Sequence, residues 1–237
     1  MQKILAIAGP TASGKTKTAI TLAKILNGEI ICVDSMQIYK QMDIGTAKVT
    51  TEEMEGIKHH LIDIVEPNIP FSVSDYVGIA RKTIDQIIEN GKLPVLVGGT
   101  GLYFESIIYP FNFGGAKTDD SIKAKLYNDL EKYGAEYLHK KLMEIDPIDG
   151  EKIHPNNTKR LIRALEIYEI TGKNKSDNAT DKQLLYDIDM FVLDWDRQTL
   201  YDRIAERVQI MFDNGLEAEV KNLINNGITF EMQSMQG

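Results

Sequence analysis

Residues 3–16 read KILAIAGPTASGKT, a short apolar run followed directly by a glycine-rich turn, and this stretch decides the fold. An apolar run that ends at a glycine is typical of a strand buried in a parallel sheet. Residues 9–16 match the pattern G-x-x-x-x-G-K-[ST], whose glycines let backbone N–H groups turn toward phosphate oxygens. A helix expected over residues 17–26 would add the favourable dipole of its N-terminus. The stretch predicts a site for a di- or triphosphate, without indicating whether that group is transferred, hydrolysed or displaced.

The alternation of apolar runs and helical patterns continues beyond this loop. Strand-like runs occupy residues 29–33, 61–65 and 93–97, and an amphipathic helix is expected over residues 74–90. Strands that alternate with helices imply right-handed crossovers and a parallel sheet covered on both faces. We therefore predict the α/β class, with a P-loop NTPase-like parallel sheet flanked by helices.

A change of pattern after about residue 112 predicts a helical insertion domain in this core. Residues 113–116 read as a linker and residues 121–172 are helical in pattern, after which a strand-like run returns at residues 187–194. The predicted parts are a P-loop catalytic core of residues 1–114 and 187–237, and a helical insertion of residues 115–186.

Composition limits the classes of protein that the chain can belong to. Apolar residues make up 43% of the 237 and charged residues 26%, which is ordinary globular usage. No apolar run approaches the roughly 20 residues of a membrane helix, and the first residues lack a signal-peptide cleavage region. The single cysteine, Cys32, excludes a disulfide framework within the chain and a cysteine-rich zinc site. We therefore expect a cytoplasmic protein with no membrane partner.

The net charge of −8 argues against a general nucleic-acid binder, because phosphate contacts need lysine and arginine. Between residues 117 and 182, however, basic and acidic residues are equal in number, so the whole acidic excess lies outside the expected insertion. The balance leaves room for a nucleic-acid contact that is confined to one part of the chain.

An acidic residue follows the strand that comes directly after the phosphate loop. Asp34 ends the run 29–33, and strand ends beside a P-loop face the ligand crevice. In kinases and NTPases an aspartate in such a place holds Mg²⁺, and Asp63 is a second candidate. The alternative role for Asp34 is that of a turn former or helix cap.

Six blocks of the sequence, in the same order, closely resemble bacterial tRNA dimethylallyltransferases, also called tRNA isopentenyltransferases. The blocks are GPTASGKT (9–16), VDSMQIYKQMDIGTAK (33–48), HHLIDIVEP (59–67), LVGGTGLY (96–103), HPNNTKRLIRALE (154–166) and RIAERVQIMFDNGLEAEV (203–220). The match covers essentially the whole chain in the family's order. The family continues beyond the SMQ of residues 234–236, so we expect this chain to be shorter than the family at its C-terminal end.

The resemblance implies an enzyme that moves a dimethylallyl group from dimethylallyl diphosphate to N6 of adenosine 37 in tRNA. Asp34 would accept the proton of the attacking amine. Lys15, Thr16 with Mg²⁺ on its hydroxyl, and Arg207 would stabilise the leaving diphosphate, with Arg203 as the second candidate for the arginine. The diphosphate-binding residues implied by the resemblance are Gly9, Thr11, Ala12, Ser13, Gly14, Lys15, Thr16, Thr100 and Arg203.

The resemblance also implies a surface that contacts tRNA, since a base modified at an inner position must leave its stack. Its residues are Asp34, Ser35, Met36, Gln37, Thr100, Lys123, Lys159, Arg160 and Arg163. Met36, Ile38 and Met42 are candidates for the wall of a prenyl pocket, although such residues more often belong to the core. We expect a tRNA anticodon stem-loop and dimethylallyl diphosphate as partners, and a monomeric protein.

Other functions compete with this interpretation. An adenylate isopentenyltransferase would share the P-loop and the aspartate, but it would not need the roughly 70 residues of insertion, whose Lys159, Arg160 and Arg163 cluster favours tRNA. A small-molecule kinase would use the same motif to bind ATP. A nucleotide-dependent binding module without catalysis is the remaining alternative.

Overall fold

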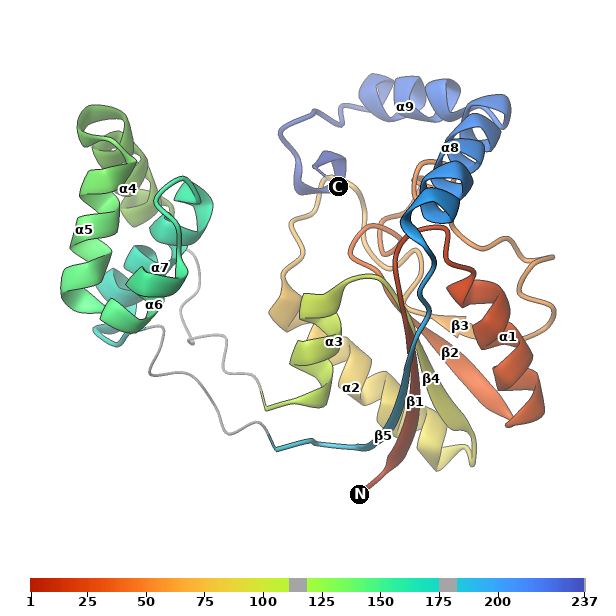
Figure 1. The fold of residues 1–237 in the computed structure, drawn as a ribbon. Coiled ribbons are helices and arrows are strands. Elements are labelled where there is room, and N and C mark those ends of the chain that lie inside the picture. The colour runs from red at the N-terminus through yellow and green to blue at the C-terminus, as the bar shows by residue number, and fades with distance from the viewer. Residues whose placement is uncertain (111–118, 175–182, 237) are drawn as a thin grey trace. The chain divides into compact units, whose positions relative to one another are not determined.

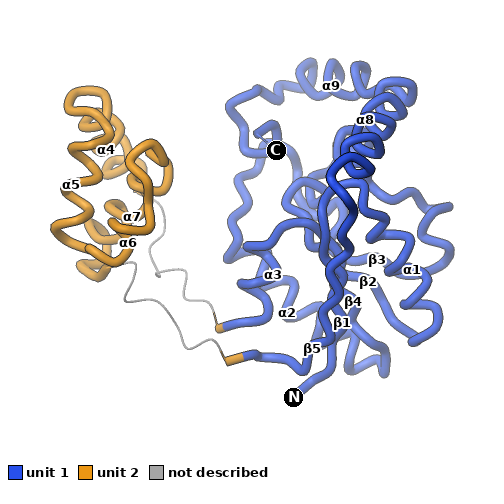
Figure 2. The backbone as a smooth tube through the Cα atoms, in the orientation of Figure 1, with its two compact units in different colours: residues 1–109, 184–237 blue, residues 110–183 orange. Residues whose placement is uncertain are grey.

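The computed structural model describes residues 1–110, 119–174 and 183–236 (Figure 1). The chain forms two compact units, residues 1–109 with 184–237 and residues 110–183 (Figure 2). The linker expected at residues 113–116 and the boundary expected after residue 114 lie outside the described residues. At the other boundary, the first unit already includes Leu184 to Tyr186, where the Leu185 N–H donates to the Ile108 carbonyl at 2.9 Å.

The first unit is built on a parallel five-stranded sheet in the order β3-β2-β4-β1-β5. Its strands are β1 Lys3–Ala8, β2 Gly28–Val33, β3 His59–His60, β4 Leu93–Gly98 and β5 Asp187–Val192. Its helices are α1 Lys15–Ile25, α2 Val73–Glu89, α3 Gly101–Ile108, α8 Arg197–Asp213 and α9 Leu216–Asn225, followed by a 3₁₀ turn at Gln233–Met235. In Figure 1, α1 lies on one face of the sheet, and α2 with α3 on the other. The predicted α/β class, with a parallel sheet flanked by helices, is confirmed.

Apolar packing holds α1 on the sheet. Ala19, Ile20 and Ala23 of α1 are buried against a cluster from three strands that includes Ile7 and Val95. On the other side, Tyr76 of α2 is fully buried and donates its hydroxyl to the Cys32 carbonyl of β2 at 2.6 Å. Its ring stacks on Tyr103 of α3 at 4.1 Å between ring centroids. Burial of apolar surface is the dominant stabilising term here.

The ends of the three central strands meet at Gly98. In the sheet register Gly98 pairs with Ala8 of β1 on one side and with Val33 of β2 on the other. A Cβ atom at Gly98 would lie 1.9 Å from the Val33 carbonyl oxygen, so only glycine fits. The residues that follow these strands therefore gather at one edge of the sheet, where ligands bind in such folds.

The strand predicted over residues 61–65 is wrong. The strand beside β2 at this edge of the sheet is instead the short β3. Of the predicted run, only Val65 makes a strand-like contact, an isolated bridge with Tyr39. Leu61 and Asp63 have φ values of 63° and 56°, a left-handed backbone that cannot continue a strand. Alternating left-handed residues turn the chain into a loop that runs beside the sheet.

Two helical features differ from the pattern in the sequence. Residues 197–226 have apolar side chains at helical spacing throughout, which indicates one long amphipathic stretch, but the chain forms two helices there, because Gly215 has a φ of 97° between α8 and α9. Helix α3 begins at Gly101, which the sequence pattern did not indicate. No helix among the described residues has the length and apolar character needed to cross a membrane.

The second unit is helical in the part that the structure describes. Its helices are α4 Asp120–Tyr133, α5 Ala135–Ile145, α6 Pro147–Lys152 and α7 Thr158–Thr171. Leucines at helical spacing, such as Leu126, Leu142 and Leu165, are fully buried and form its core. The buried Glu166 accepts from the Asp119 N–H at 3.0 Å and thereby ties α7 to the start of α4.

At the opposite end of the sheet, the buried Glu29 of β2 contacts His60 of β3 and Lys92, the residue before β4. Glu29 accepts from Lys92 Nζ at 2.8 Å and contacts His60 Nε2 at 2.6 Å. Burial alone would raise the pKa of Glu29, but its hydrogen bonds with Lys92 and His60 outweigh burial and lower that pKa. Its stabilising contribution is therefore present above the ordinary pKa of a glutamate and is lost as the pH falls through the lowered value.

Glu29→Gln should reduce the free energy of unfolding at pH 7 by about 1–3 kcal/mol, because Lys92 then loses its charged partner. The difference from the wild type should shrink below about pH 4, where glutamates become protonated. Urea unfolding at several pH values measures both effects. Glu89→Gln, an exposed change on α2, is the matched control; a gap that persists at low pH would contradict the account.

Candidate active site

The glycine-rich loop adopts the backbone that anion binding requires. Gly9 and Gly14 have φ values of 149° and 93°, and Ala12 lies in the left-handed region at 63°. Lys15 Nζ donates to the Pro10 carbonyl at 2.5 Å, so the lysine folds back over the loop. Gly14 ends the loop as the N-cap of α1, whose first N–H groups are left for an anion. The predicted phosphate loop is thus formed between β1 and α1.

Two side chains from the C-terminal part of the chain hold this loop from outside. Arg203 Nε donates to the Ala12 carbonyl at 2.7 Å, and Trp195 Nε1 donates to the Ser13 carbonyl at 3.0 Å. The Arg203 guanidinium also lies 5.0 Å from the centre of the Trp195 ring, a cation–π contact. The donors neutralise two carbonyl oxygens whose partial negative charge would oppose a phosphate group.

Asp34, Lys15 and Arg207 form a cluster of charges beside the loop. Burial, followed by the charge of Arg207, lowers the pKa of Lys15, whereas Asp34 opposes that shift. Burial also lowers the pKa of Arg207, and Asp34 again opposes it. Two half-buried cations thus share one carboxylate. One positive charge is therefore left without a partner in a half-buried place, which costs free energy. An anion bound here would neutralise it.

The Asp34 carboxylate uses only one of its oxygens within the protein. Oδ1 accepts from the backbone N–H of Met36 at 2.8 Å and of Gln37 at 3.3 Å, so Asp34 does form a turn. In the described part of the chain, Oδ2 has no hydrogen-bond partner. The aspartate is therefore held in place by one oxygen and can accept a proton on the other.

Arg203 and Arg207 of α8, between which the sequence left the choice open, have different surroundings. Arg203 supports the phosphate loop. Arg207 lines the pocket beside Asp34, donates through Nη2 to the Thr46 carbonyl at 3.4 Å, and has a buried Nε without a partner among the described residues. The geometry favours Arg207 as the arginine that contacts a ligand.

A pocket of about 340 Å³ adjoins this charged cluster. Its polar wall includes Thr11, Asp34 and Arg207. Its apolar wall comprises Met36, Met42, Ile204, Val208, Met211, Leu216, Val220, Leu223 and Met235. Met36 and Met42 are therefore at the pocket, as the sequence suggested, whereas Ile38 is fully buried and is not in its lining. The pocket has a charged end and a methionine-rich end, which suits a ligand with a charged head and an apolar tail.

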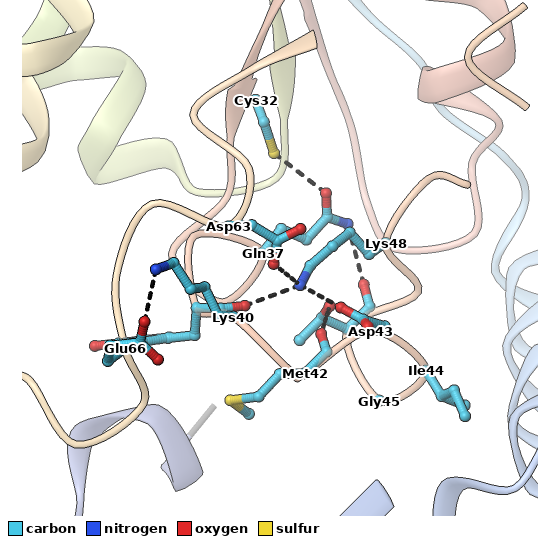
Figure 3. Close-up of polar contacts among 12 residues, drawn as sticks. Cys32, Gln37, Lys40, Met42, Asp43, Ile44, Gly45, Lys48, Asp63 and Glu66 are labelled. Atoms are coloured by element: carbon cyan, nitrogen blue, oxygen red, sulfur yellow. Dashed lines mark hydrogen bonds and ion pairs between the residues drawn. The ribbon is translucent and has the colours of Figure 1, made fainter. Parts of the chain in front are cut away.

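The segment from residue 35 to residue 48 contributes Met36, Met42, Gly45 and Thr46 to the pocket lining. Polar contacts among its residues and their neighbours fix it in place (Figure 3). The Gln37 amide donates to the carbonyls of Thr46 at 3.0 Å and Ala47 at 3.3 Å, and it accepts from Cys32 Sγ at 3.2 Å. Thr100 Oγ1 accepts from the Ser35 N–H at 3.1 Å. Gln37 and Thr100, both residues of the predicted tRNA surface, thus also hold the segment in place.

Lys48 is a buried residue that holds this segment together, and the sequence did not indicate it. Its side chain is 5% exposed, and Nζ donates to the Tyr39 carbonyl at 2.9 Å, to Asp43 at 2.6 Å and to Asp63 at 2.5 Å (Figure 3). The three bonds hold residues 39, 43 and 63 together around one buried ammonium group, while the Asp43 and Asp63 carboxylates remain partly exposed to water. One of its partners, Asp63, lies 15 residues later in the chain, so no local sequence pattern indicates this role.

The remaining predicted tRNA contacts lie in the second unit. Lys159 and Arg160 are exposed on the first turn of α7, and Lys123 is half-buried on α4. Arg163 pairs with the buried Glu166 at 2.8 Å, which gives it a structural role within the unit. Lys159 and Arg160 thus keep the exposed charge that contact with phosphate requires.

The chemistry of the donor set suits Mg²⁺. The side chain of Thr16 is exposed at the start of α1, and Asp34 offers its free oxygen. Among the described residues no group of three or more His, Cys, Asp or Glu side chains could hold a metal. Mg²⁺ commonly binds one or two protein oxygens together with phosphate and water, so this sparse set fits a metal that arrives with a phosphate ligand.

Comparisons with known proteins agree on one family. A family model described as IPP transferase matches residues 37–237, and one described as Isopentenyl transferase matches residues 2–70. The tRNA dimethylallyltransferase of Bacillus cytotoxicus is 49% identical over 237 residues, which cover 99% of this chain and 75% of the relative. That of Bacillus cereus strain AH187 is 52% identical over 241 residues, with 99% and 74% covered.

Solved structures give the same answer. The full-length tRNA isopentenylpyrophosphate transferase from Bacillus halodurans has a TM-score of 0.71 at 48% identity, covering 100% of this chain and 74% of that one. A eukaryotic dimethylallyltransferase, solved while acting on tRNA, has a TM-score of 0.85 at 31% identity, covering 100% and 61%.

Lys15→Met should weaken the binding of inorganic pyrophosphate by at least about tenfold, because a charge-assisted hydrogen bond to a half-buried anion is worth about 1.5–3 kcal/mol. The fluorescence of Trp195, the single tryptophan, reports binding because its ring donates to the phosphate loop. Lys17→Met, an exposed change two residues away, should bind as the wild type does. Equal affinities for both variants would contradict the assignment of the loop.

Proposed function

Since this chain belongs to the tRNA dimethylallyltransferase family, also called tRNA isopentenyltransferases, we propose that its P-loop binds the diphosphate of a prenyl donor. The protein is an enzyme that transfers a dimethylallyl group onto tRNA. In the finer form that we propose, the donor is dimethylallyl diphosphate and the acceptor is N6 of adenosine 37.

One observation carries the proposal for the donor: the phosphate loop, the two cations and the methionine-lined pocket adjoin one another. A prenyl diphosphate has a head with several negative charges and a short apolar tail, and these match the two ends of the pocket. The adenine of ATP would instead need hydrogen-bonding groups that an apolar wall does not provide.

The reaction needs a base and a stabilised leaving group. The lone pair of N6 attacks C1 of the dimethylallyl group, the C1–O bond breaks with its electrons on the diphosphate, and the N6 proton passes to Asp34. The free oxygen of Asp34 is the acceptor, while its other oxygen keeps the carboxylate oriented. Proton removal during bond formation makes the weakly nucleophilic amine reactive.

The diphosphate gains negative charge as it leaves, and the site supplies positive charge on two sides. Lys15 and the N–H groups of the loop lie on one side, and Arg207 lies on the other with its Nε free of protein partners in the described part of the chain. Groups that are already in place stabilise such charge without reorganisation. Mg²⁺, held by the Thr16 hydroxyl and the diphosphate, would supply further electrostatic stabilisation of that group.

For the tRNA we propose two contact regions. Residues Asp34 to Gln37 and Thr100 would meet the flipped base, and Lys123, Lys159, Arg160 and Arg163 of the second unit would meet the backbone of the anticodon stem. Gln37 would exchange part of its hydrogen bonding for the base, since its amide is engaged by Thr46 and Ala47. No step needs a second chain, so we propose a monomer that acts in the cytoplasm, where its substrate is.

Transfer of a labelled dimethylallyl group tests the function directly. An anticodon stem-loop with adenosine at position 37 should gain the label. The donor should release one diphosphate for each group transferred. A stem-loop with guanosine at that position should gain none. Labelling of free AMP in preference to the stem-loop would favour an adenylate isopentenyltransferase, and steady ATP hydrolysis without prenyl transfer would favour a kinase-like enzyme.

Asp34→Asn should lower kcat for prenyl transfer by about 10²–10⁴-fold, because an amide cannot accept the proton. Its side-chain oxygen can still accept from Met36 and Gln37, so the turn should persist. Donor affinity should be kept or rise, because a negative charge beside Lys15 and Arg207 is removed. Asp85→Asn, an exposed change on α2, is the charge-matched control. Wild-type kcat in Asp34→Asn would remove this residue from the role of base.

A further inference from the structure

We propose that Glu219 of α9 is a specificity-determining residue: its carboxylate fixes the width of the apolar pocket and thereby selects a five-carbon donor over longer prenyl chains. The inference rests on the proposed function, because it concerns the same pocket. Glu219 was not among the site residues expected from the sequence, and its side chain meets a turn about 175 residues earlier in the chain.

The Glu219 carboxylate binds three consecutive backbone N–H groups. Oε2 accepts from Asp43 at 2.8 Å and from Ile44 at 2.7 Å, and Oε1 accepts from Gly45 at 2.9 Å. Successive N–H groups that converge on one anion form a strong binding nest, and each bond is charge-assisted. In the described part of the chain these are the only hydrogen bonds between this turn and α9. The carboxylate therefore sets how closely α9 approaches the turn.

The turn moves as one body because it is closed on itself. Thr46 Oγ1 donates to the Met42 carbonyl at 2.6 Å, and the Lys48 N–H donates to the Asp43 carbonyl at 2.9 Å. Lys48 Nζ adds the ion pair with Asp43 that Figure 3 shows beside Met42, Ile44 and Gly45. A shift at the three N–H groups is thus passed to the whole turn.

The two elements joined by Glu219 both line the pocket. Met42, Gly45 and Thr46 line it from the turn. Leu216, Val220 and Leu223 line it from α9. The spacing of these walls limits the length of an apolar tail that fits behind the diphosphate.

The same turn also touches the catalytic groups. The Thr46 carbonyl accepts from Arg207 at 3.4 Å, so displacement of the turn would alter the arginine as well as the wall. Glu219 itself lies in the lining but adds no proton acceptor that the reaction needs, since Asp34 has that role. We therefore assign Glu219 to selection and positioning, and expect its loss to change which donor is used more than whether any donor is used.

Glu219→Gln is the first test, because it keeps the size of the side chain but removes its charge and turns an N–H₂ group toward backbone donors. The ratio of kcat/KM for dimethylallyl diphosphate to that for geranyl diphosphate should fall by at least about tenfold, the discrimination that one or more methylenes usually provide in an apolar pocket. Affinity for inorganic pyrophosphate, followed by Trp195 fluorescence, should fall by less than this ratio, because the turn contacts Arg207 but not Lys15 or the loop N–H groups. Glu217→Gln, which only breaks an exposed pair with Lys221, is the matched control and should keep the wild-type ratio.

Gly45→Ala is a second variant that keeps the carboxylate. Gly45 does not have a left-handed φ, so alanine suits its backbone, but the added Cβ would lie 3.2 Å from Leu216 Cδ1 and 3.4 Å from a Glu219 oxygen. Either the Leu216 side chain or the turn must then shift by a few tenths of an ångström, and both belong to the pocket lining. The C5-to-C10 ratio should fall in the same direction as in Glu219→Gln, and by less. This variant decides the question if Glu219→Gln does not fold.

Binding of the two donors in the absence of tRNA separates this inference from the proposed function. Trp195 fluorescence should show that Glu219→Gln loses the preference for dimethylallyl over geranyl diphosphate, whether or not transfer follows. A wild-type ratio in both variants, with normal pyrophosphate binding, would overturn the role of Glu219 and leave the prenyl-transfer proposal intact. Absence of wild-type transfer from any prenyl donor would instead contradict the proposed function.

Discussion

The meeting of three strand ends at Gly98 is the constraint on which the site depends. Gly98 pairs with both Ala8 and Val33, and no side chain fits between it and the Val33 carbonyl. The register places the start of the phosphate loop, Asp34 and the turn before α3 at one edge of the sheet. A parallel sheet brings such ends together by its geometry, so chemistry can be assembled from short loops that are distant in sequence.

The balance of charge at this edge explains the kind of ligand that the site binds. Lys15 and Arg207 are half-buried, and Asp34 offsets only one of their charges. Arg203 and Trp195 remove a competing source of negative potential by binding carbonyl oxygens of the loop. A diphosphate supplies the missing charge. The chain as a whole is acidic at −8, so the positive potential is local and does not make the protein a general binder of polyanions.

The sequence was sufficient where short-range physics decides the structure. Apolar runs predicted β1, β2 and β4 because these strands are buried on both faces, and the glycine motif predicted the phosphate loop because few other loops need its conformation. The strand predicted at residues 61–65 is wrong because the left-handed backbone of Leu61 and Asp63 cannot be recognised from the hydropathy of the sequence. Lys48 and Glu219 were missed for a different reason: their partners lie elsewhere in the chain, and only the folded structure brings them together.

The central claim is that one site places a prenyl diphosphate on the phosphate loop and an adenine amine beside Asp34. The most direct measurement is a crystal structure with an unreactive thio analogue of dimethylallyl diphosphate and a tRNA anticodon stem-loop. We predict diphosphate oxygens against the N–H groups of residues 9–16, the prenyl group between Met42 and α9, and N6 within about 3.2 Å of the free Asp34 oxygen. A diphosphate bound away from the loop, or an N6 that faces a group other than Asp34, would contradict the account.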